Sequence, residues 1–249
     1  MNQIPLAYAI IPARYNSSRF PGKPLATIMG KPMFWHVYSR AKQCPNISAV
    51  FLATDDERIY KTAQAYKIPC LMTSSEPQSG TDRVVEAIRS LNLSPGSIVI
   101  NIQGDEPTIH PSMLTQLIEP FYSSITQVTT LARLIGLKEA ENPNVVKIVC
   151  SHQGHALYFS RSVIPYIRDN SSRAYWAHIG IYGFRVDTLE KFSSLSPSPL
   201  EKQEQLEQLR LLEIGIPIRV VATSFKTHGV DTPEDLKDVE EIITKNSEQ

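Results

Sequence analysis

The chain has 249 residues, of which 42% are hydrophobic and 20% charged, so it is long enough for one large domain or two small ones with a substantial core. Its 25 Lys and Arg residues balance 25 Asp and Glu residues. This balance argues against a protein that binds nucleic acid or an anionic membrane through its overall charge. We therefore expect any anion-binding site to be local.

The three cysteines, Cys44, Cys70 and Cys150, lie far apart and form no CxxC pair. This spacing favours buried or half-buried thiols in a reducing compartment over a disulfide or a metal site. The first residues lack the basic region and apolar stretch of a signal peptide. No apolar run approaches the roughly 18 residues that a membrane-spanning helix needs. We therefore expect a cytoplasmic protein.

The first half of the chain alternates short apolar runs with helical patterns. Strands are predicted at residues 6–11, 49–53, 69–72 and 98–102. Helices are predicted at residues 33–43, 56–66, 81–91 and 111–122. Because the strands are apolar throughout, both faces of their sheet should be buried, as in a parallel sheet with βαβ crossovers.

The second half is less regular. Strands are predicted at residues 128–131, 145–149, 156–159, 179–184 and 218–221, and some of them should be antiparallel. Ser198 and Glu201 form a capping box for a helix that runs to about Ile214 and stops at Gly215. Thr232 is predicted to cap a final helix. Since no linker divides the chain, we predict a single α/β domain over residues 1–249.

Residues 12–25 form a basic segment directly after the first predicted strand. It carries Arg14, Arg19 and Lys23 and is too interrupted by Pro and Gly to be helical. A basic loop at the carboxyl end of the first strand is where an open α/β sheet binds phosphates. The phosphate-binding patterns GxxxxGK[ST] and GxGxxG are both absent, which removes the main support for a kinase or a dehydrogenase. The segment predicts a polyphosphate site, with a solvated surface loop as the alternative.

Two acidic motifs follow much later in the chain. Asp105 comes directly after a predicted strand, where its carboxylate could bind Mg²⁺ together with substrate phosphate oxygens. A simple Gly-Asp turn is the alternative. Asp231 lies just before the predicted cap at Thr232, so it is a candidate for a second metal ligand.

A third polar motif, SGTDR at residues 79–83, opens the helix predicted at residues 81–91. Its hydroxyls and backbone amides could contact a base or a ribose. Capping of the helix by Ser79 explains the same spacing equally well.

Seven motifs occur in order from residue 12 to residue 236: PARYNSSRFPGKPL, SGTDR, NIQGDEP, YFSR, HIGIYGF, SPLEKQEQLEQLR and GVDTPEDL. Together they resemble the 3-deoxy-manno-octulosonate cytidylyltransferases, the CMP-Kdo synthetases of Gram-negative bacteria. Related sugar nucleotidyltransferases share the basic loop, whereas the combination of QGDEP, HIGIYGF and LEQLR is specific. The resemblance implies a Rossmann-like nucleotidyltransferase fold with a mostly parallel central sheet flanked by helices. It also implies a smaller dimerisation region in the second half, and hence a homodimer.

The resemblance assigns roles to individual residues. It implies that Arg14, Ser18 and Lys23 bind the phosphates of CTP, with Arg14 and Lys23 also stabilising charge in the reaction. Asp105 and Asp231 would hold Mg²⁺, and Ser79 and Arg83 would help bind the cytidine. The positions implied for the acidic sugar are Gln103, Arg161, Arg168, His178, Tyr182, Glu207 and Gln208.

The resemblance implies transfer of CMP from CTP to the anomeric hydroxyl of Kdo for lipopolysaccharide synthesis, with release of pyrophosphate. Residues 169–175, just before the His178 motif, form a shorter segment than is typical of the family, so 8-amino-Kdo is an alternative substrate. Sialate is another. A protein of a different class, a nucleotide sensor without catalysis, is disfavoured because it has little need for both Asp105 and Asp231.

Overall fold

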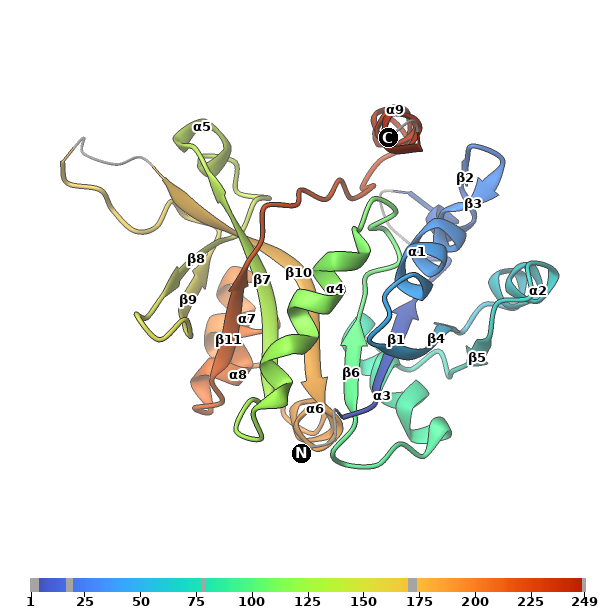
Figure 1. The fold of residues 1–249 in the computed structure, drawn as a ribbon, viewed down its shortest axis with the longest axis horizontal. Coiled ribbons are helices and arrows are strands. Elements are labelled where there is room, and N and C mark those ends of the chain that lie inside the picture. Colours follow the sequence, from blue (N-terminus) through green and yellow to red (C-terminus); the bar gives the residue numbers. More distant parts are fainter. Residues whose placement is uncertain (1–4, 17–19, 78, 170–173, 248–249) are drawn as a thin grey trace.

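The computed structural model describes residues 5–16, 20–77, 79–169 and 174–247. One sheet of nine strands runs through the molecule in the order β11-β7-β10-β6-β1-β4-β5, with β8 paired to β10 and β9 paired to β8 (Figure 1). The strands are β1 (Ala7–Pro12), β4 (Ile47–Thr54), β5 (Cys70–Met72), β6 (Ile98–Asn101), β7 (Val128–Ile135), β8 (Lys147–Cys150), β9 (Ala156–Ser160), β10 (Tyr175–Arg185) and β11 (Ile218–Ala222). A separate short hairpin consists of β2 (Thr27–Ile28) and β3 (Lys31–Pro32).

The pairing confirms the mostly parallel sheet expected for the first half. Strand β1 lies between β4 and β6 and is parallel to both, and β5 continues this arrangement. Strand β10 is antiparallel to β6, β7 and β8, as expected for part of the second half. Because the chain leaves β1 for neighbours on opposite sides, a crevice is expected at the carboxyl ends of β1 and β6. The basic loop and Asp105 both follow these two ends.

The helices of the first half lie close to their predicted bounds: α1 (Met33–Lys42), α2 (Glu57–Ala65), α3 (Gly80–Leu91) and α4 (Pro111–Ile118). A 3-10 turn, η2 (Glu119–Tyr122), extends α4 to the end of the predicted helix. Later elements include α5 (Leu137–Ala140) and α6 (Val186–Ser193), which the sequence analysis did not predict.

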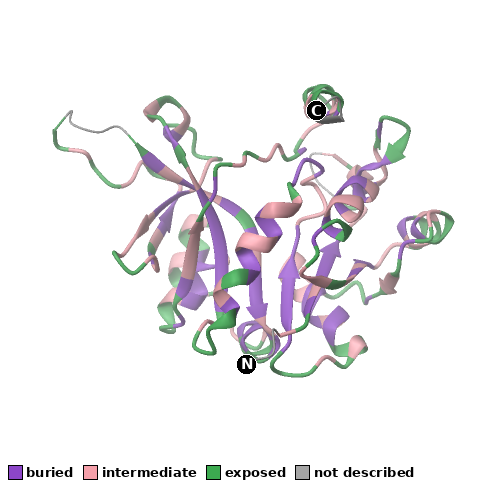
Figure 2. Ribbon diagram, viewed as in Figure 1, coloured by how far each residue is buried: buried purple, intermediate pink, exposed green. Residues whose placement is uncertain are grey.

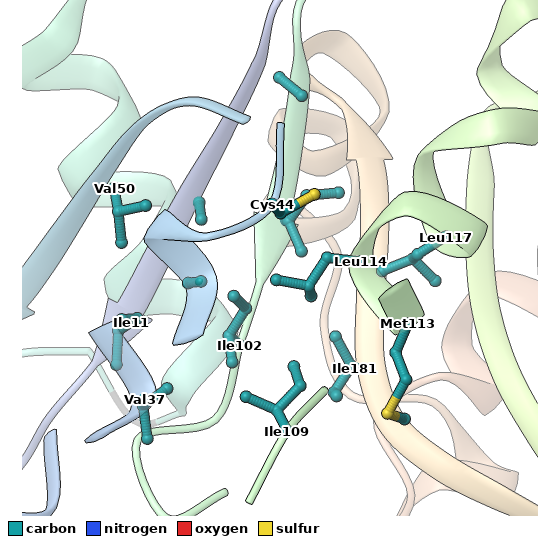
Figure 3. Packing of buried hydrophobic residues seen from close by; sticks show 14 of the residues in the cluster. Ile11, Val37, Cys44, Val50, Ile102, Ile109, Met113, Leu114, Leu117 and Ile181 are labelled. Atoms are coloured by element: carbon teal, nitrogen blue, oxygen red, sulfur yellow. The ribbon is translucent and has the colours of Figure 1, made fainter. Parts of the chain in front are cut away.

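Side chains on the two faces of β1 enter two different apolar clusters. Ala9 and Ile11 pack with residues of α1 and α4, including Val37 and Leu114 (Figure 3). Ile10 points the other way and packs with residues of α3 and α6. Both faces of the central strands are therefore buried (Figure 2), which explains why their sequences are apolar throughout rather than alternating.

The single helix predicted from Ser198 to about Ile214 is wrong. The capping box of Ser198 and Glu201 is confirmed, but α7 (Pro199–Glu204) ends early and α8 (Leu209–Glu213) follows after a break. Gln205 adopts a left-handed conformation with φ of 53°. Leu206 and Leu209 are still buried in one cluster, so the apolar spacing resembled that of a continuous helix although the backbone turns between them.

The last helix, α9 (Asp235–Ser247), begins later than predicted. The predicted capping pattern of Thr232 and Asp235 is present in part: the Asp235 carboxylate accepts hydrogen bonds from the backbone amides of Asp231 and Thr232, each at 2.8 Å, as the acidic residue of a capping box does for its cap residue. Helix α9 packs against the β2–β3 hairpin, where the backbone amide of Met29 donates to Glu240 at 3.0 Å (Figure 1). No helix in the described ranges has the length and apolar character needed to cross a bilayer.

Candidate active site

The loop after β1 has a defined shape. Lys23 begins a short 3-10 turn, η1 (Lys23–Leu25), directly after Gly22 at a φ of 72°. The backbone amide of Gly22 donates to the Tyr15 carbonyl at 2.8 Å, and a Cβ atom at position 22 would lie 3.1 Å from the Tyr15 ring. Glycine therefore suits both the left-handed backbone and the close approach of the ring. This turn directs Lys23 toward the end of β6.

Lys23 brings the two acidic motifs together. Its Nζ atom donates to Asp105 Oδ2 at 2.5 Å and to the Val230 carbonyl at 2.8 Å. The same Nζ atom lies 3.9 Å from Asp231 Oδ1. The backbone amide of Val230 also donates to the Asp105 carbonyl at 2.9 Å. The segment of Lys23 thus meets two other segments, which lie 82 and 207 positions further along the chain.

The two carboxylates fit the donor set of a Mg²⁺ site. They already share one cation, the ammonium of Lys23. Within the described residues, no group of three or more Asp, Glu, His or Cys side chains could hold a metal ion. Mg²⁺ commonly binds one or two carboxylates and completes its shell with water and substrate phosphates. Asp105 and Asp231 suit an ion that arrives with a nucleotide.

A cavity of about 390 Å³ opens beside this cluster, and Arg14, Lys23, Gln103 and Asp105 are among the residues that line it. Burial and the nearby Arg83 guanidinium lower the pKa of Arg14 from its ordinary value, but an arginine stays protonated at neutral pH. The cavity therefore has two cations for a polyphosphate. Ser18, the third predicted phosphate ligand, lies outside the described residues.

Arg83 has a structural partner that the sequence did not suggest. Its guanidinium is fully buried, forms an ion pair with Asp55 at 2.9 Å and donates to the hydroxyl of Thr73. It lies against a separate cavity of about 380 Å³ that Arg14 and Asp55 also line. Ser79 caps α3 in a capping box with Asp82. A contact of Arg83 or Ser79 with cytidine stays a prediction.

A larger cavity, of about 860 Å³, adjoins the first. The two share Gly80 and Gln103 in their walls. Five of the other residues predicted to bind the sugar also line the larger cavity: Arg161, His178, Tyr182, Glu207 and Gln208. Arg168 does not line it and is exposed on the loop after β9. The structure thus brings together six of the seven predicted sugar positions.

His178 is a neutral hydrogen-bonding group in the larger cavity. Its Nε2 atom lies 3.0 Å from Thr130 Oγ1, and that hydroxyl also lies 3.0 Å from the Ile181 carbonyl. Burial lowers the pKa of His178 to about 3. Burial also raises the pKa of the neighbouring Tyr182. Both side chains are therefore uncharged at neutral pH, and they suit hydroxyls better than a carboxylate.

The break between α7 and α8 places Glu207 and Gln208 in the cavity wall. Burial raises the pKa of Glu207, while hydrogen bonds from Thr81 and Ser79 act in the opposite direction. The Gln208 Nε2 atom is buried without a hydrogen-bond partner among the described residues. Buried polar atoms normally have partners, so this atom is suited to a polar ligand.

Two arginines face the larger cavity, and both have partners on the protein. Arg161 Nε donates to the Glu204 carbonyl at 2.8 Å, and its Nη1 atom donates to the Pro143 carbonyl at 3.1 Å. Arg133 pairs with Glu139. Arg161 was predicted and Arg133 was not. A guanidinium has five N–H donors, so each can bind an anion in addition to its protein partners.

Sequence reasoning also missed Glu106, Asn101 and Thr227 in the wall of the larger cavity. Burial, followed by the charge of Asp105, raises the pKa of Glu106 to about 7. The signal that could have identified Glu106 was its place next to Asp105 at the end of a strand. Thr227 had no comparable signal. It lies in the irregular segment between β11 and α9, and local sequence does not indicate that this segment reaches the cavity.

Comparison with known proteins agrees with this arrangement. A family model described as "Cytidylyltransferase" matches residues 8–221. A protein of Oleidesulfovibrio alaskensis named 3-deoxy-manno-octulosonate cytidylyltransferase is 55% identical over 241 residues, which is 96% of this chain and 97% of the relative. A protein of the same name from Lawsonia intracellularis is 54% identical over 250 residues, covering 100% of this chain and 98% of the relative.

A solved structure shares the whole fold. It is described as CMP:2-keto-3-deoxy-manno-octonic acid synthetase complexed with CTP. The TM-score is 0.92 at 43% sequence identity, and the match covers 97% of this chain and 99% of the solved chain. The likeness therefore extends over nearly the whole chain.

Proposed function

The chain belongs to the cytidylyltransferase family, and from that premise we propose that it transfers CMP from CTP to the anomeric hydroxyl of Kdo, releasing pyrophosphate, in lipopolysaccharide synthesis. The observation that carries this function is the pair of adjoining cavities. The smaller one is lined by the cations Arg14 and Lys23 and by Asp105. The larger one is lined by hydrogen-bonding side chains that suit a polyhydroxy acid.

The shared wall at Gly80 and Gln103 gives the reaction its geometry. With the triphosphate in the smaller cavity and the sugar in the larger one, the anomeric hydroxyl faces the α-phosphate across this wall. The hydroxyl loses its proton to solvent, its oxygen forms the new bond to the α-phosphorus, and the bond from the α-phosphorus to the bridging oxygen breaks so that pyrophosphate leaves. Arg14 and Lys23 stabilise the negative charge on the departing pyrophosphate. We assign Ser18 to the same phosphates.

Asp105 and Asp231 would hold Mg²⁺ in this reaction. The support is their shared contact with one cation and their position beside the phosphate cavity. When bound, the ion neutralises phosphate charge and lowers the pKa of a coordinated hydroxyl. The protein's part is to keep the two carboxylates together, through the hydrogen bond between the Val230 amide and the Asp105 carbonyl.

The larger cavity supports the sugar assignment of Gln103, Arg161, His178, Tyr182, Glu207 and Gln208, while Arg168 would have to move to take part. Ser79 and Arg83 are assigned to the cytidine side. The balanced charge of the chain does not favour binding of nucleic acid or an anionic membrane. We propose that the enzyme is cytoplasmic. We also propose a homodimer, because apolar side chains are exposed on the strands of the second half.

Pyrophosphate release separates the candidate substrates. The wild-type protein is incubated with CTP, Mg²⁺ and, in turn, Kdo, 8-amino-Kdo or sialate. We expect the highest kcat/KM with Kdo. A higher kcat/KM with 8-amino-Kdo or sialate would show that Kdo is not the preferred substrate. Tight CTP binding without any pyrophosphate release would favour a nucleotide sensor over an enzyme.

A further inference from the structure

Glu106 joins the two segments that carry the proposed metal ligands. It follows Asp105 directly, and an interaction with Thr227, on the segment that leads to Asp231, counters part of the rise in its pKa. A Cβ atom at Gly229 would lie 3.2 Å from Glu106 Oε1. The Glu106 carboxyl group therefore lies close to Gly229, where a larger side chain would crowd it.

One oxygen of this carboxyl group lacks a partner. Glu106 Oε2 is buried and accepts no hydrogen bond from any residue that the structure describes. Glu106 lines the larger cavity together with Thr227 and Gly229. Leaving a buried carboxyl oxygen without a hydrogen bond is unfavourable. A donor that arrives with a ligand in the cavity would remove that penalty.

The local charges indicate which part of a sugar acid supplies the donor. The Glu106 carboxyl group offers a hydrogen-bond acceptor to a sugar hydroxyl but no cation to a sugar carboxylate. The cations of the larger cavity are Arg133 and Arg161, and they suit the carboxylate.

We propose that the Glu106 carboxyl group accepts a hydrogen bond from a hydroxyl of the sugar acid and so sets the orientation of the sugar, with its carboxylate toward Arg133 and Arg161. This inference rests on the proposed function, because it needs a polyhydroxy acid in the larger cavity. Glu106 would thus join the residues that the family resemblance assigns to the sugar, although that resemblance did not include it.

The test is steady-state pyrophosphate release by the wild-type protein and by Glu106→Ala and Glu106→Gln. Leaving a buried hydroxyl without its hydrogen-bond partner corresponds to roughly a 10- to 100-fold effect. We expect KM for Kdo to rise by about that factor in Glu106→Ala, with KM for CTP changed by no more than about twofold. Glu106→Gln keeps an acceptor oxygen and the shape of the side chain, and it should show a smaller rise. Glu57→Gln, on the exposed face of α2, is the matched control and should leave both KM values unchanged.

Deoxy analogues of Kdo distinguish direct contact from a structural role. In the wild-type protein, removal of the hydroxyl that contacts Glu106 should raise KM about 10-fold. In Glu106→Ala the same removal should have little further effect, because the acceptor is already gone, and in Glu106→Gln, which keeps an acceptor oxygen, the effect should be smaller than in the wild-type protein. If every deoxy analogue shows an undiminished penalty in both variants, or if KM for CTP rises as much as KM for Kdo, the inference is overturned. An inactive wild-type protein would instead refute the proposed function.

Discussion

At the scale of single residues, Lys23 holds together the segments that carry Asp105 and Asp231. Its ammonium contacts Asp105 and the Val230 carbonyl and lies within 4 Å of Asp231. Only a flexible cation with three donors can satisfy such unlike groups at once. Motif spacing indicated that Lys23 and Asp105 belonged to one site, but it contained no sign that the two would contact each other.

Replacement of Asp105 by Asn tests the metal role directly. The amide keeps the size of the side chain but removes its negative charge, so the pair with Asp231 loses its affinity for a divalent cation. We expect kcat to fall by about 100-fold or more, with a much smaller change in CTP affinity measured by calorimetry. Asp238→Asn, on the exposed face of α9, is the control. An unchanged turnover rate in Asp105→Asn would exclude Asp105 as a metal ligand.

Buried polar residues show where residue-level prediction ends. His178 and Tyr182 were identified through a family motif, and the structure places both in the larger cavity. Arg133 and Glu106 line the same cavity without having been predicted to bind the sugar. Arg133 lies on a strand that reads as ordinary apolar sequence, and its role depends on which strand is its neighbour. That neighbour is set by tertiary pairing rather than by local pattern.

At the scale of elements, the break between α7 and α8 is the main departure from the predicted structure. Periodic leucines predicted one helix, because apolar spacing reports which side chains are buried and not whether the backbone is continuous. Gln205 reverses the sign of φ at the break. As a result, Glu207 and Gln208 line the larger cavity. The helix prediction was therefore wrong next to two residues that are predicted to bind the sugar.

Variants of Gln205 measure the cost and the purpose of this break. A left-handed conformation costs an L-residue about 1–2 kcal/mol, and more for a β-branched one, whereas glycine adopts it readily. We expect Gln205→Val to lower the free energy of unfolding by about 1–2 kcal/mol in urea titrations and to raise KM for Kdo. Gln205→Gly should stay within about 1 kcal/mol of the wild-type protein. Equal stability of the two variants would contradict the assigned strain.

At the scale of the whole molecule, the sheet links two halves with different roles. The parallel strands β1 and β6 end at the smaller cavity, and the antiparallel strands β7 and β10 carry residues of the larger cavity. The chain then returns from β11 to place Asp231 beside Lys23, and α9 holds this segment against the β2–β3 hairpin. The cluster of Lys23, Asp105 and Asp231 therefore forms only when segments from the beginning, middle and end of the chain come together.

The second half also predicts the assembly state. Leu134 on β7 and Leu157 on β9 are 57% and 61% exposed, and exposed apolar side chains on strands favour an interface. We expect light scattering after size-exclusion chromatography to give a dimer, and Leu134→Arg combined with Leu157→Arg to give a monomer. Ile125→Arg, at an 81% exposed position before β7, should stay dimeric. A monomeric wild-type protein would refute the homodimer.

Local sequence patterns predicted most of the strands and helices and suggested the chemistry of the motifs. Apolar runs marked the strands, and the cations and carboxylates after β1 and β6 indicated phosphate and metal chemistry, because both patterns reflect local burial and charge. The fold determines that Lys23 contacts Asp105 and lies close to Asp231, that Arg83 is buried against Asp55, and that Glu106 lines the larger cavity. These contacts connect residues far apart in the chain, and their formation depends on strand order and packing, which local sequence patterns do not encode.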